Sequence, residues 1–163
     1  MPLTPLPEHT SKQYDAELEA VRARVLKMGG MVEEQILKAV HALSTGDRDL
    51  MATVIDDDAR VNALEVGIDE DCQHIIARRQ PAAGDLRMIL AIIKTITDLE
   101  RIGDEAQKIA RMARTIYERD TMTSPRFNEI KHVADVAVDM LRKALDSFAR
   151  LDLTATSEIV RQD

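Results

Sequence analysis

Glu100 and Asp104 are the residues whose type and spacing most clearly suggest chemistry in this chain. They lie four positions apart in a segment rich in Ile and Leu, so on a helix their carboxylates project from the same face, one turn apart. The apolar pattern indicates that this helix packs against other elements. Two acids on a packed face repel each other, and burial costs on the order of several kcal/mol for each unless a cation or a hydrogen-bond donor compensates it. The pair therefore suggests one half of a metal site.

A second polar set interrupts the apolar pattern of an earlier segment. Asp58 and Glu65 fall seven positions apart in a column where a helical bundle usually places apolar residues, and Asn62 follows Asp58 by one turn. We therefore predict a metal site formed by Asp58, Asn62, Glu100 and Asp104, with Glu65 as a weaker candidate ligand. Ligands that are all oxygens favour Mg²⁺, Ca²⁺, Mn²⁺ or ferric iron over structural zinc.

A solvated groove between helices is the alternative to a metal site. Arg101 and Lys108 lie on the same segment as Glu100 and Asp104, and in a groove they would compensate the acidic charge. Spacing alone leaves both alternatives open.

The chain has no glycine-rich phosphate loop, no Ser-His-Asp set and no nucleotide-binding fingerprint, so we expect it not to be an enzyme. The alternative is a metal-cluster enzyme of the di-iron carboxylate type, which needs two Glu-x-x-His motifs facing inward. Residues 129–132 have this spacing, and residues 71–74 are the nearest partner. However, Ile130 and Val133 are predicted to take the core face, which would turn Glu129 and His132 toward solvent.

The composition favours long amphipathic helices. Of the 163 residues, 31% are charged and only 2% are aromatic. The net charge of −7 and the lack of a long basic block argue against nucleic-acid binding. The single cysteine, Cys72, excludes an internal disulfide and is predicted to be a small buried residue. No segment approaches the roughly 20 apolar residues of a membrane span, so we expect a cytoplasmic protein.

Apolar spacing predicts an all-α fold with short connections. The first three predicted helices cover residues 11–44, 48–79 and 86–119. A turn-rich linker at 121–125 follows, then a fourth helix that ends near residue 150 and a fifth that begins at 151. Gly46 and Asp47 should end the first helix and cap the second, and Asp85 should cap the third. Gly29 and Gly30 interrupt the first helix and indicate a kink or the close approach of another helix.

An internal repeat divides the chain. Residues 31–58 align with residues 136–163 at a spacing of 105, with apolar columns and an inter-helix turn in register. We therefore predict a disordered segment at 1–10, a three-helix bundle at 11–120 and the first part of a second bundle at 121–163. By this pattern, another helix and a half or more should follow.

These motifs together resemble the PhoU family of bacterial phosphate-signalling regulators. The strongest match is the run from Leu99 to Asp104, which has the family's (E/D)-x-x-x-D motif. The resemblance extends from about His9 to the end of the chain. The other matching runs begin at Tyr14, Met28, Gly67 and Ala77 and read YDAELE, MGGMVE, GIDEDC and ARRQP.

The resemblance implies two tandem three-helix bundles, each with acidic motifs on two facing helices that bind a multinuclear iron or zinc cluster. The counterparts in the first unit are Asp58-x-x-x-Asn62 and Glu100-x-x-x-Asp104. In the second unit the early motif would begin at Asp163, and the later one would lie beyond it.

The resemblance also implies a protein that works by binding partners. It would be a negative regulator of the phosphate-starvation response and of phosphate uptake, in the cytoplasm at the inner membrane face. The expected partners are the ATPase of the phosphate ABC transporter and the sensor histidine kinase, and we also expect a homodimer. Arg78 and Arg79, at a predicted helix end, are candidate contacts for an acidic partner surface, with compensation of the helix dipole as the alternative.

Overall fold

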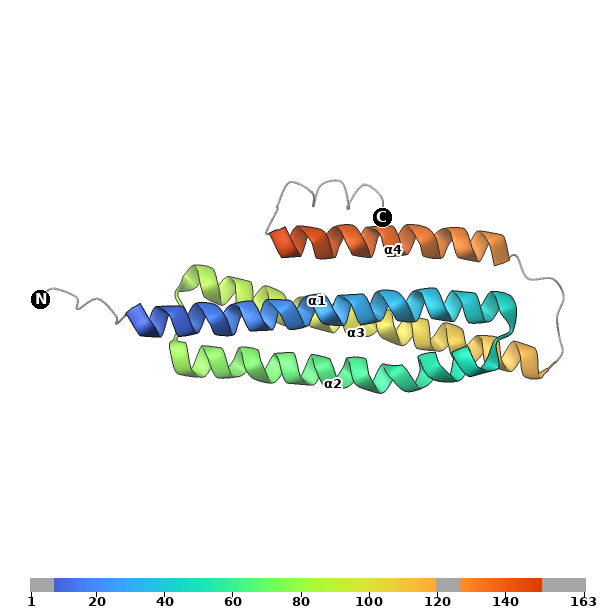
Figure 1. Cartoon of the computed structure of the whole chain (residues 1–163), viewed down its shortest axis with the longest axis horizontal. Coiled ribbons are helices and arrows are strands. Elements are labelled where there is room, and N and C mark those ends of the chain that lie inside the picture. The colour runs from blue at the N-terminus through green and yellow to red at the C-terminus, as the bar shows by residue number, and fades with distance from the viewer. Residues whose placement is uncertain (1–7, 120–126, 151–163) are drawn as a thin grey trace, which may run out of the picture.

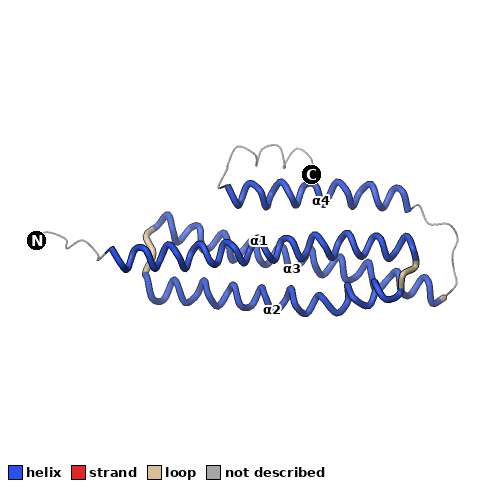
Figure 2. Tube along the Cα trace, in the orientation of Figure 1, coloured by secondary structure: helices blue, strands red, loops and turns tan. Residues whose placement is uncertain are grey.

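Four helices make up the part of the chain that the computed structural model describes, which is residues 8–119 and 127–150 (Figures 1 and 2). They are α1 (Glu8–Thr45), α2 (Arg48–Arg79), α3 (Ala83–Glu118) and α4 (Phe127–Arg150). No strand occurs within these two stretches, which confirms the predicted all-α fold. The predicted linker at 121–125 and the predicted fifth helix lie outside the described residues.

The first three helices form a bundle in which each helix packs against the other two, as Figure 1 shows. Each contributes a stripe of side chains at spacings of three, four and seven residues, which is the pattern of helices that share a core. The most buried members are Val25, Met28 and Val32 of α1, Val54, Val61 and Ile68 of α2, and Ile89, Ile92 and Ile96 of α3. Cys72 belongs to this core, as predicted, and burial raises the pKa of its thiol to about 11.

The turn between α1 and α2 confirms the predicted cap. Gly46 has a φ of 73°, a left-handed conformation that glycine adopts at little cost, and its N–H donates to the Ala42 carbonyl at 2.8 Å. The carboxylate of Asp47 then accepts a hydrogen bond from the Leu50 N–H at 3.0 Å. The ring of Tyr117 covers the turn, and its hydroxyl donates to the Leu43 carbonyl at 2.9 Å. The end of α3 is thereby fixed to the turn.

The start of α3 differs from the prediction. The helix begins at Ala83, three residues earlier than expected, and its N-cap, Ala82, makes no side-chain capping bond. The Leu86 N–H donates to the Ala82 carbonyl at 2.9 Å, so helical hydrogen bonding has already begun when the chain reaches Asp85. The prediction that Asp85 caps this helix is therefore wrong. Its carboxylate lies in the first turn, where it still interacts favourably with the helix dipole.

Helix α4 packs against α1 alone among the described helices (Figure 1). Its buried residues are Val138 and Leu141. The prediction that Ile130 and Val133 take the core face is wrong, because their side chains are 40% and 67% exposed. The apolar period of α4 was identified correctly, but no second described helix covers that part of the face.

The approach of α4 to α1 occurs at the predicted glycine pair. A Cβ built on Gly29 would lie 2.6 Å from Leu145 Cδ1, whereas one built on Gly30 would meet no atom within 4 Å. The structure thus confirms a close helix approach and assigns it to Gly29. Across the same junction, Arg142 Nε donates to Glu33 Oε1 at 2.7 Å.

None of the four described helices is long and apolar enough to cross a membrane.

Candidate metal site

Asp58 lies inside the bundle, where α2 faces α3. Its side chain is only 6% exposed, although it is an acid. Gln107 Nε2 of α3 donates a hydrogen bond to Asp58 Oδ2 at 3.0 Å, and Asn62 Nδ2, one turn along α2, faces the same oxygen at 3.5 Å. The second oxygen, Oδ1, has no hydrogen-bond partner. One buried carboxylate is therefore only half satisfied by the protein.

The surroundings of Asp58 oppose its ionisation. Burial raises the pKa of this carboxyl above its ordinary value of 3.8, and the nearby Asp104 carboxylate raises it further. Smaller opposing effects come from Gln35, Arg111 and Asn62. A nearby positive charge would therefore stabilise the ionised form of the Asp58 carboxyl.

Glu100 belongs to the same acidic cluster. Burial raises its pKa above the ordinary 4.5, and the carboxylates of Asp104, Glu65 and Asp58 each raise it further. The charges of the acids that spacing selected on α2 and α3, Glu65 included, therefore act on one another, although no three of them are grouped so that they could hold one ion. We call Asp58, Asn62, Glu65, Glu100 and Asp104 the acidic cluster.

The basic residues of the solvated-groove alternative lie at the outer edge of the cluster, where Glu105 and, more weakly, Asp104 raise the pKa of Lys108. Lys108 Nζ pairs with Glu105 at 2.7 Å on the outer side of α3. Arg101 is exposed, although its charge acts to lower the pKa of Glu100. Asp104 lines a shallow surface depression together with Arg101 and Lys108. The outer edge of the cluster is therefore exposed to solvent, whereas Asp58 is buried.

Gln35 of α1 is a buried neighbour of the cluster that the sequence reasoning missed. Its side chain is 3% exposed, and neither of its amide atoms has a hydrogen-bond partner. Its amide lies near Asp58 and lowers the pKa of that carboxyl as a hydrogen-bond donor does, although the two side chains do not meet in the geometry of a formed hydrogen bond. A signal existed in the sequence, because Gln35 occupies the seven-residue column of Val21, Met28 and Ala42. A polar residue in an apolar column was the criterion that selected Asp58.

The donor set fits a cation that prefers oxygen. Unpartnered buried oxygens belong to Asp58 (Oδ1), Asn62 (Oδ1) and Gln35 (Oε1), and buried polar atoms without partners are rare in proteins. Within the described residues, however, no three His, Cys, Asp or Glu side chains are grouped so that they could hold one ion. Amide oxygens would therefore have to complete the coordination. They are acceptable ligands for Ca²⁺, Mg²⁺ and Mn²⁺.

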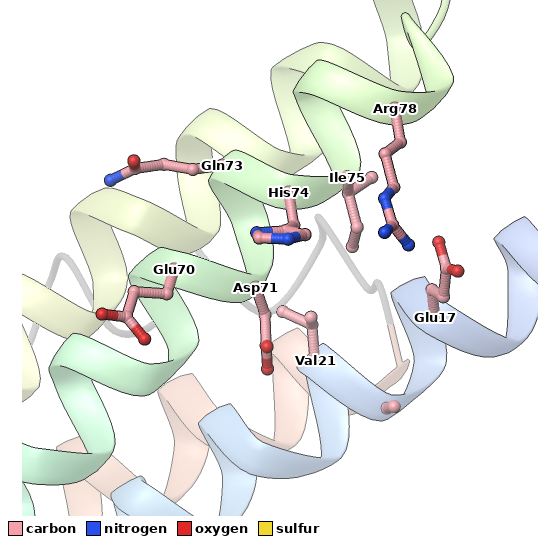
Figure 3. Close-up of a pocket in the computed structure, with 9 residues that line it drawn as sticks. Glu17, Val21, Glu70, Asp71, Gln73, His74, Ile75 and Arg78 are labelled. Atoms are coloured by element: carbon pink, nitrogen blue, oxygen red, sulfur yellow. The ribbon is translucent and has the colours of Figure 1, made fainter.

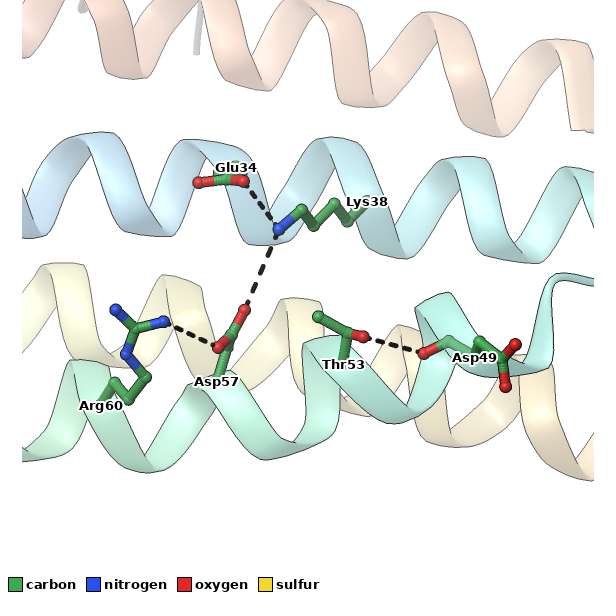
Figure 4. A network of polar contacts seen from close by, with 6 residues as sticks. All are labelled: Glu34, Lys38, Asp49, Thr53, Asp57 and Arg60. Atoms are coloured by element: carbon green, nitrogen blue, oxygen red, sulfur yellow. Dashed lines mark hydrogen bonds and ion pairs between the residues drawn. The ribbon is translucent and has the colours of Figure 1, made fainter.

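The neighbouring acid, Asp57, has a different role. It faces α1 at the surface, where its carboxylate pairs with Arg60 at 3.2 Å and lies 4.0 Å from Lys38 Nζ (Figure 4). Lys38 also pairs with Glu34 at 2.7 Å. Two successive aspartates thus point to different places, one into a surface ion network and the other into the bundle.

The candidate partner contacts Arg78 and Arg79 lie at the end of α2 and have separate environments. Arg79 forms two hydrogen bonds with the Glu17 carboxylate of α1, at 2.8 and 3.2 Å, and these bonds hold the pKa of Glu17 below its usual value. Arg78 is exposed and lines an open groove of about 640 Å³ with Glu17, Glu70 and His74 (Figure 3). Of the two arginines, Arg78 is the more accessible.

The two motifs of the di-iron alternative are not brought together. Residues 71–74 lie on α2 and residues 129–132 on α4, and these two helices make no contact in the described structure. Asp71 pairs with Arg24, while His74 and His132 are both exposed. The arrangement that such a centre needs, two motifs facing one another, is absent from the described helices.

Comparison with known proteins gives one consistent result. The profile of the PhoU domain matches residues 25–113. The chain is 48% identical over 159 residues to the phosphate-specific transport system accessory protein PhoU homolog of Pseudomonas putida, covering 97% of this chain and 61% of that protein. It is 46% and 44% identical over 158 residues to the phosphate-specific transport system accessory proteins PhoU of Edwardsiella tarda and Escherichia coli, covering 97% of this chain and 64% and 65% of theirs. The chain thus spans less than two thirds of the length of these relatives.

The solved structures agree with the fold. The crystal structure of PhoU from Pseudomonas aeruginosa superposes with a TM-score of 0.84 at 45% identity, covering 89% of this chain and 69% of that one. The phosphate transport system regulatory protein PhoU from Streptococcus pneumoniae gives a TM-score of 0.83 at 24% identity, with 91% and 69% covered. The second likeness concerns the fold alone.

Proposed function

This chain belongs to the PhoU family, and from that premise we propose that it is a negative regulator of the phosphate-starvation response and of phosphate uptake. The observation that carries the proposal is the 44–48% identity, over 97% of the chain, to relatives that are named accessory proteins of the phosphate-specific transport system. A regulator of this kind acts through protein–protein contacts and not through turnover of a substrate.

The proposed partners are the ATPase of the phosphate ABC transporter and the sensor histidine kinase, in the cytoplasm at the inner membrane face. When phosphate is plentiful, the bundle would stabilise the inhibitory conformation of the kinase. The exposed end of α2 supports a docking role, because Arg78 borders an open groove whose other charged residues include Glu17 and Glu70. A homodimer is part of the same proposal.

Metal binding at the acidic cluster is the second part of the proposal. Asp58 and Asn62 on α2 and Glu100 and Asp104 on α3 would hold the ion, with Glu65 in support. A bound iron, zinc, manganese or magnesium ion would supply positive charge that offsets the repulsion between these acids. The raised pKa values of Asp58 and Glu100 and the unpartnered oxygen of Asp58 support this assignment.

The experiment is deletion of the gene in its own organism, followed by measurement of alkaline phosphatase in high phosphate. Loss of repression, restored by the wild-type gene, is the expected result. Normal repression in the deletion strain would contradict the regulatory function.

Two variants separate the parts of the proposal. Arg78→Glu should weaken capture of the ATPase or the kinase by the purified protein while lowering its thermal stability only slightly, because the side chain is exposed but lies in the last turn of α2 beside Glu17. Glu100→Ala should lower the bound metal measured by mass spectrometry. If Glu100→Ala leaves both metal content and repression unchanged, the cluster has no part in signalling.

A further inference from the structure

We infer that the side-chain oxygen of Gln35 is a ligand of the proposed metal site, so that a cation held by the acids of α2 and α3 also binds α1. This inference rests on the proposed metal-binding capacity of the acidic cluster and deepens it, because it adds a ligand from the third helix of the bundle.

The first argument is the burial of Gln35 without partners. An amide has two donor hydrogens and an acceptor oxygen, and an interior amide normally satisfies most of them. Gln35 is 3% exposed, and neither its nitrogen nor its oxygen finds a partner. By contrast Gln107, another amide beside Asp58, donates to Asp58 Oδ2 at 3.0 Å. Packing alone does not explain why a glutamine occupies this position, because an apolar side chain of similar length would avoid the loss of hydrogen bonds.

The second argument is that two unpartnered acceptors converge on one glycine. A Cβ built on Gly103 of α3 would lie 2.9 Å from Gln35 Oε1 and 3.8 Å from Asp58 Oδ1. These oxygens come from α1 and α2, and neither has a hydrogen-bond donor. Val61 Cγ1 borders the same region, 3.6 Å from the built Cβ, and two unpartnered acceptors in one small region are a place that a cation can satisfy. Any side chain at position 103 would occupy the region, so the glycine keeps it open.

The third argument is the shortage of acidic ligands. No three His, Cys, Asp or Glu side chains of the described residues are grouped so that they could hold one ion. A cation at the acidic cluster would therefore need neutral oxygens as further ligands, and those of Asn62 and Gln35 are both buried and unpartnered. Gln35 is the one of the two that belongs to a third helix. Helix α4 packs against α1. A ligand from α1 would therefore link the ion to the helix against which α4 packs.

Hydration of Gln35 is the competing explanation. The residue also lines a cavity of about 70 Å³ between α1 and α2, beside the ion network of Lys38, Asp57 and Arg60 (Figure 4). A cavity of this size can contain water. If Gln35 is only hydrated, its substitution should leave the metal affinity unchanged. If Gln35 is a ligand, its substitution should lower that affinity.

The experiment measures Mn²⁺ binding to the full chain by calorimetry, with free Mn²⁺ followed by electron paramagnetic resonance. Gln35→Leu should weaken Mn²⁺ binding at least tenfold and raise the melting temperature of the metal-free protein, because the unsatisfied amide is removed. Gln35→Glu should restore or strengthen Mn²⁺ binding by supplying a carboxylate oxygen. Gln73→Leu, which removes an exposed amide from α2, is the matched control and should leave the Mn²⁺ affinity unchanged.

Hydrogen exchange gives a readout that a purely structural glutamine would not change. In the wild type, Mn²⁺ should slow amide exchange in α1 around Gln35 as well as in α2 and α3. In Gln35→Leu the slowing in α1 should be lost.

The possible results separate the role of Gln35 as a ligand from metal binding by the acidic cluster. If Mn²⁺ binds the wild type and Gln35→Leu equally, while Asp58→Asn abolishes binding, Gln35 is only hydrated and the acidic cluster remains the metal site. If the wild type binds neither Mn²⁺, ferric iron nor Zn²⁺, the proposed metal binding fails, and the role of Gln35 fails with it.

Discussion

Gly29 of α1 lies directly against Leu145 of α4. A Cβ built on Gly29 would be 2.6 Å from Leu145 Cδ1 and 3.1 Å from Leu145 Cγ, closer than carbon atoms approach without a shift. Gly30, its neighbour, would meet no atom within 4 Å. The two glycines look equivalent in the sequence, yet only one of them is required by the packing of α4.

Alanine at the two positions should therefore have opposite effects on stability. Gly30→Ala should stabilise the protein by about 0.8–1 kcal/mol, the difference in helix propensity between the residues. Gly29→Ala should destabilise it by about 1 kcal/mol, because overpacking costs about 1–3 kcal/mol and exceeds the gain in propensity. Urea denaturation of the two variants measures both effects. Combining Gly29→Ala with Leu145→Ala should remove the clash and recover the gain in propensity, and equal stabilisation by both single variants would contradict the close approach.

The Asp47 cap should contribute measurably to the junction of α1 and α2. Asp47→Ala removes the acceptor of the Leu50 N–H and should lower the free energy of unfolding by about 1 kcal/mol. Asp47→Asn keeps an acceptor oxygen and should lower it by much less. Thermal denaturation of the three proteins tests this prediction. Equal losses for Ala and Asn would show that the carboxylate charge, and not the capping bond, is what matters.

The helix boundaries show which features sequence reasoning predicts well. The limits of α2 are those that were predicted, because Asp47 begins the helix and Pro81 follows its end, and both act through local backbone chemistry. Asp85 was the wrong cap for α3 because the backbone after Pro81 enters the helix directly. A local signal identifies a possible cap, but the path of the incoming chain decides whether it is used.

The buried cluster shows why part of a site escapes prediction. Asp58 was found because a charge in an apolar column is conspicuous, and Asn62 because it lies one turn from that charge. Gln35 is uncharged and has no acid one turn away on α1. Ile130 and Val133 show a different limit. Periodicity identifies the apolar face of α4, but the number of helices that cover this face depends on tertiary structure.

Removal of the Asp58 charge should stabilise the metal-free protein at neutral pH. Because the pKa of Asp58 is raised above 3.8 in the fold, the folded state binds more protons than the unfolded state between the two pKa values. The destabilisation is therefore complete above the folded pKa and disappears as the pH falls below about 3.8. Asp58→Asn should be more stable than the wild type at pH 7, and the difference should vanish at low pH.

Urea denaturation across a series of pH values measures this difference. Asp57→Asn is the control, because it removes a surface acid paired with Arg60 and Lys38 and should not stabilise the protein. A gain for Asp58→Asn that persists unchanged at low pH would show that packing, and not ionisation, is its cause.

The exposed apolar face of α4 should contribute more to the binding of apolar molecules at the surface than to the free energy of unfolding. Ile130 and Val133 line a groove of about 430 Å³ with Ile102 and Ile109 of α3, and its walls are almost entirely apolar. The double variant Ile130→Ser and Val133→Ser should reduce binding of an apolar dye severalfold and lower the free energy of unfolding by only about 1 kcal/mol, because Val133 is 67% exposed and Ile130 is 40% exposed. Leu141→Ala, by contrast, should cost about 2–3 kcal/mol, since Leu141 is buried between α4 and α1. Dye fluorescence and urea denaturation separate the two effects, and a loss of stability in the double variant as large as that of Leu141→Ala would contradict the assignment of Ile130 and Val133 to an uncovered face.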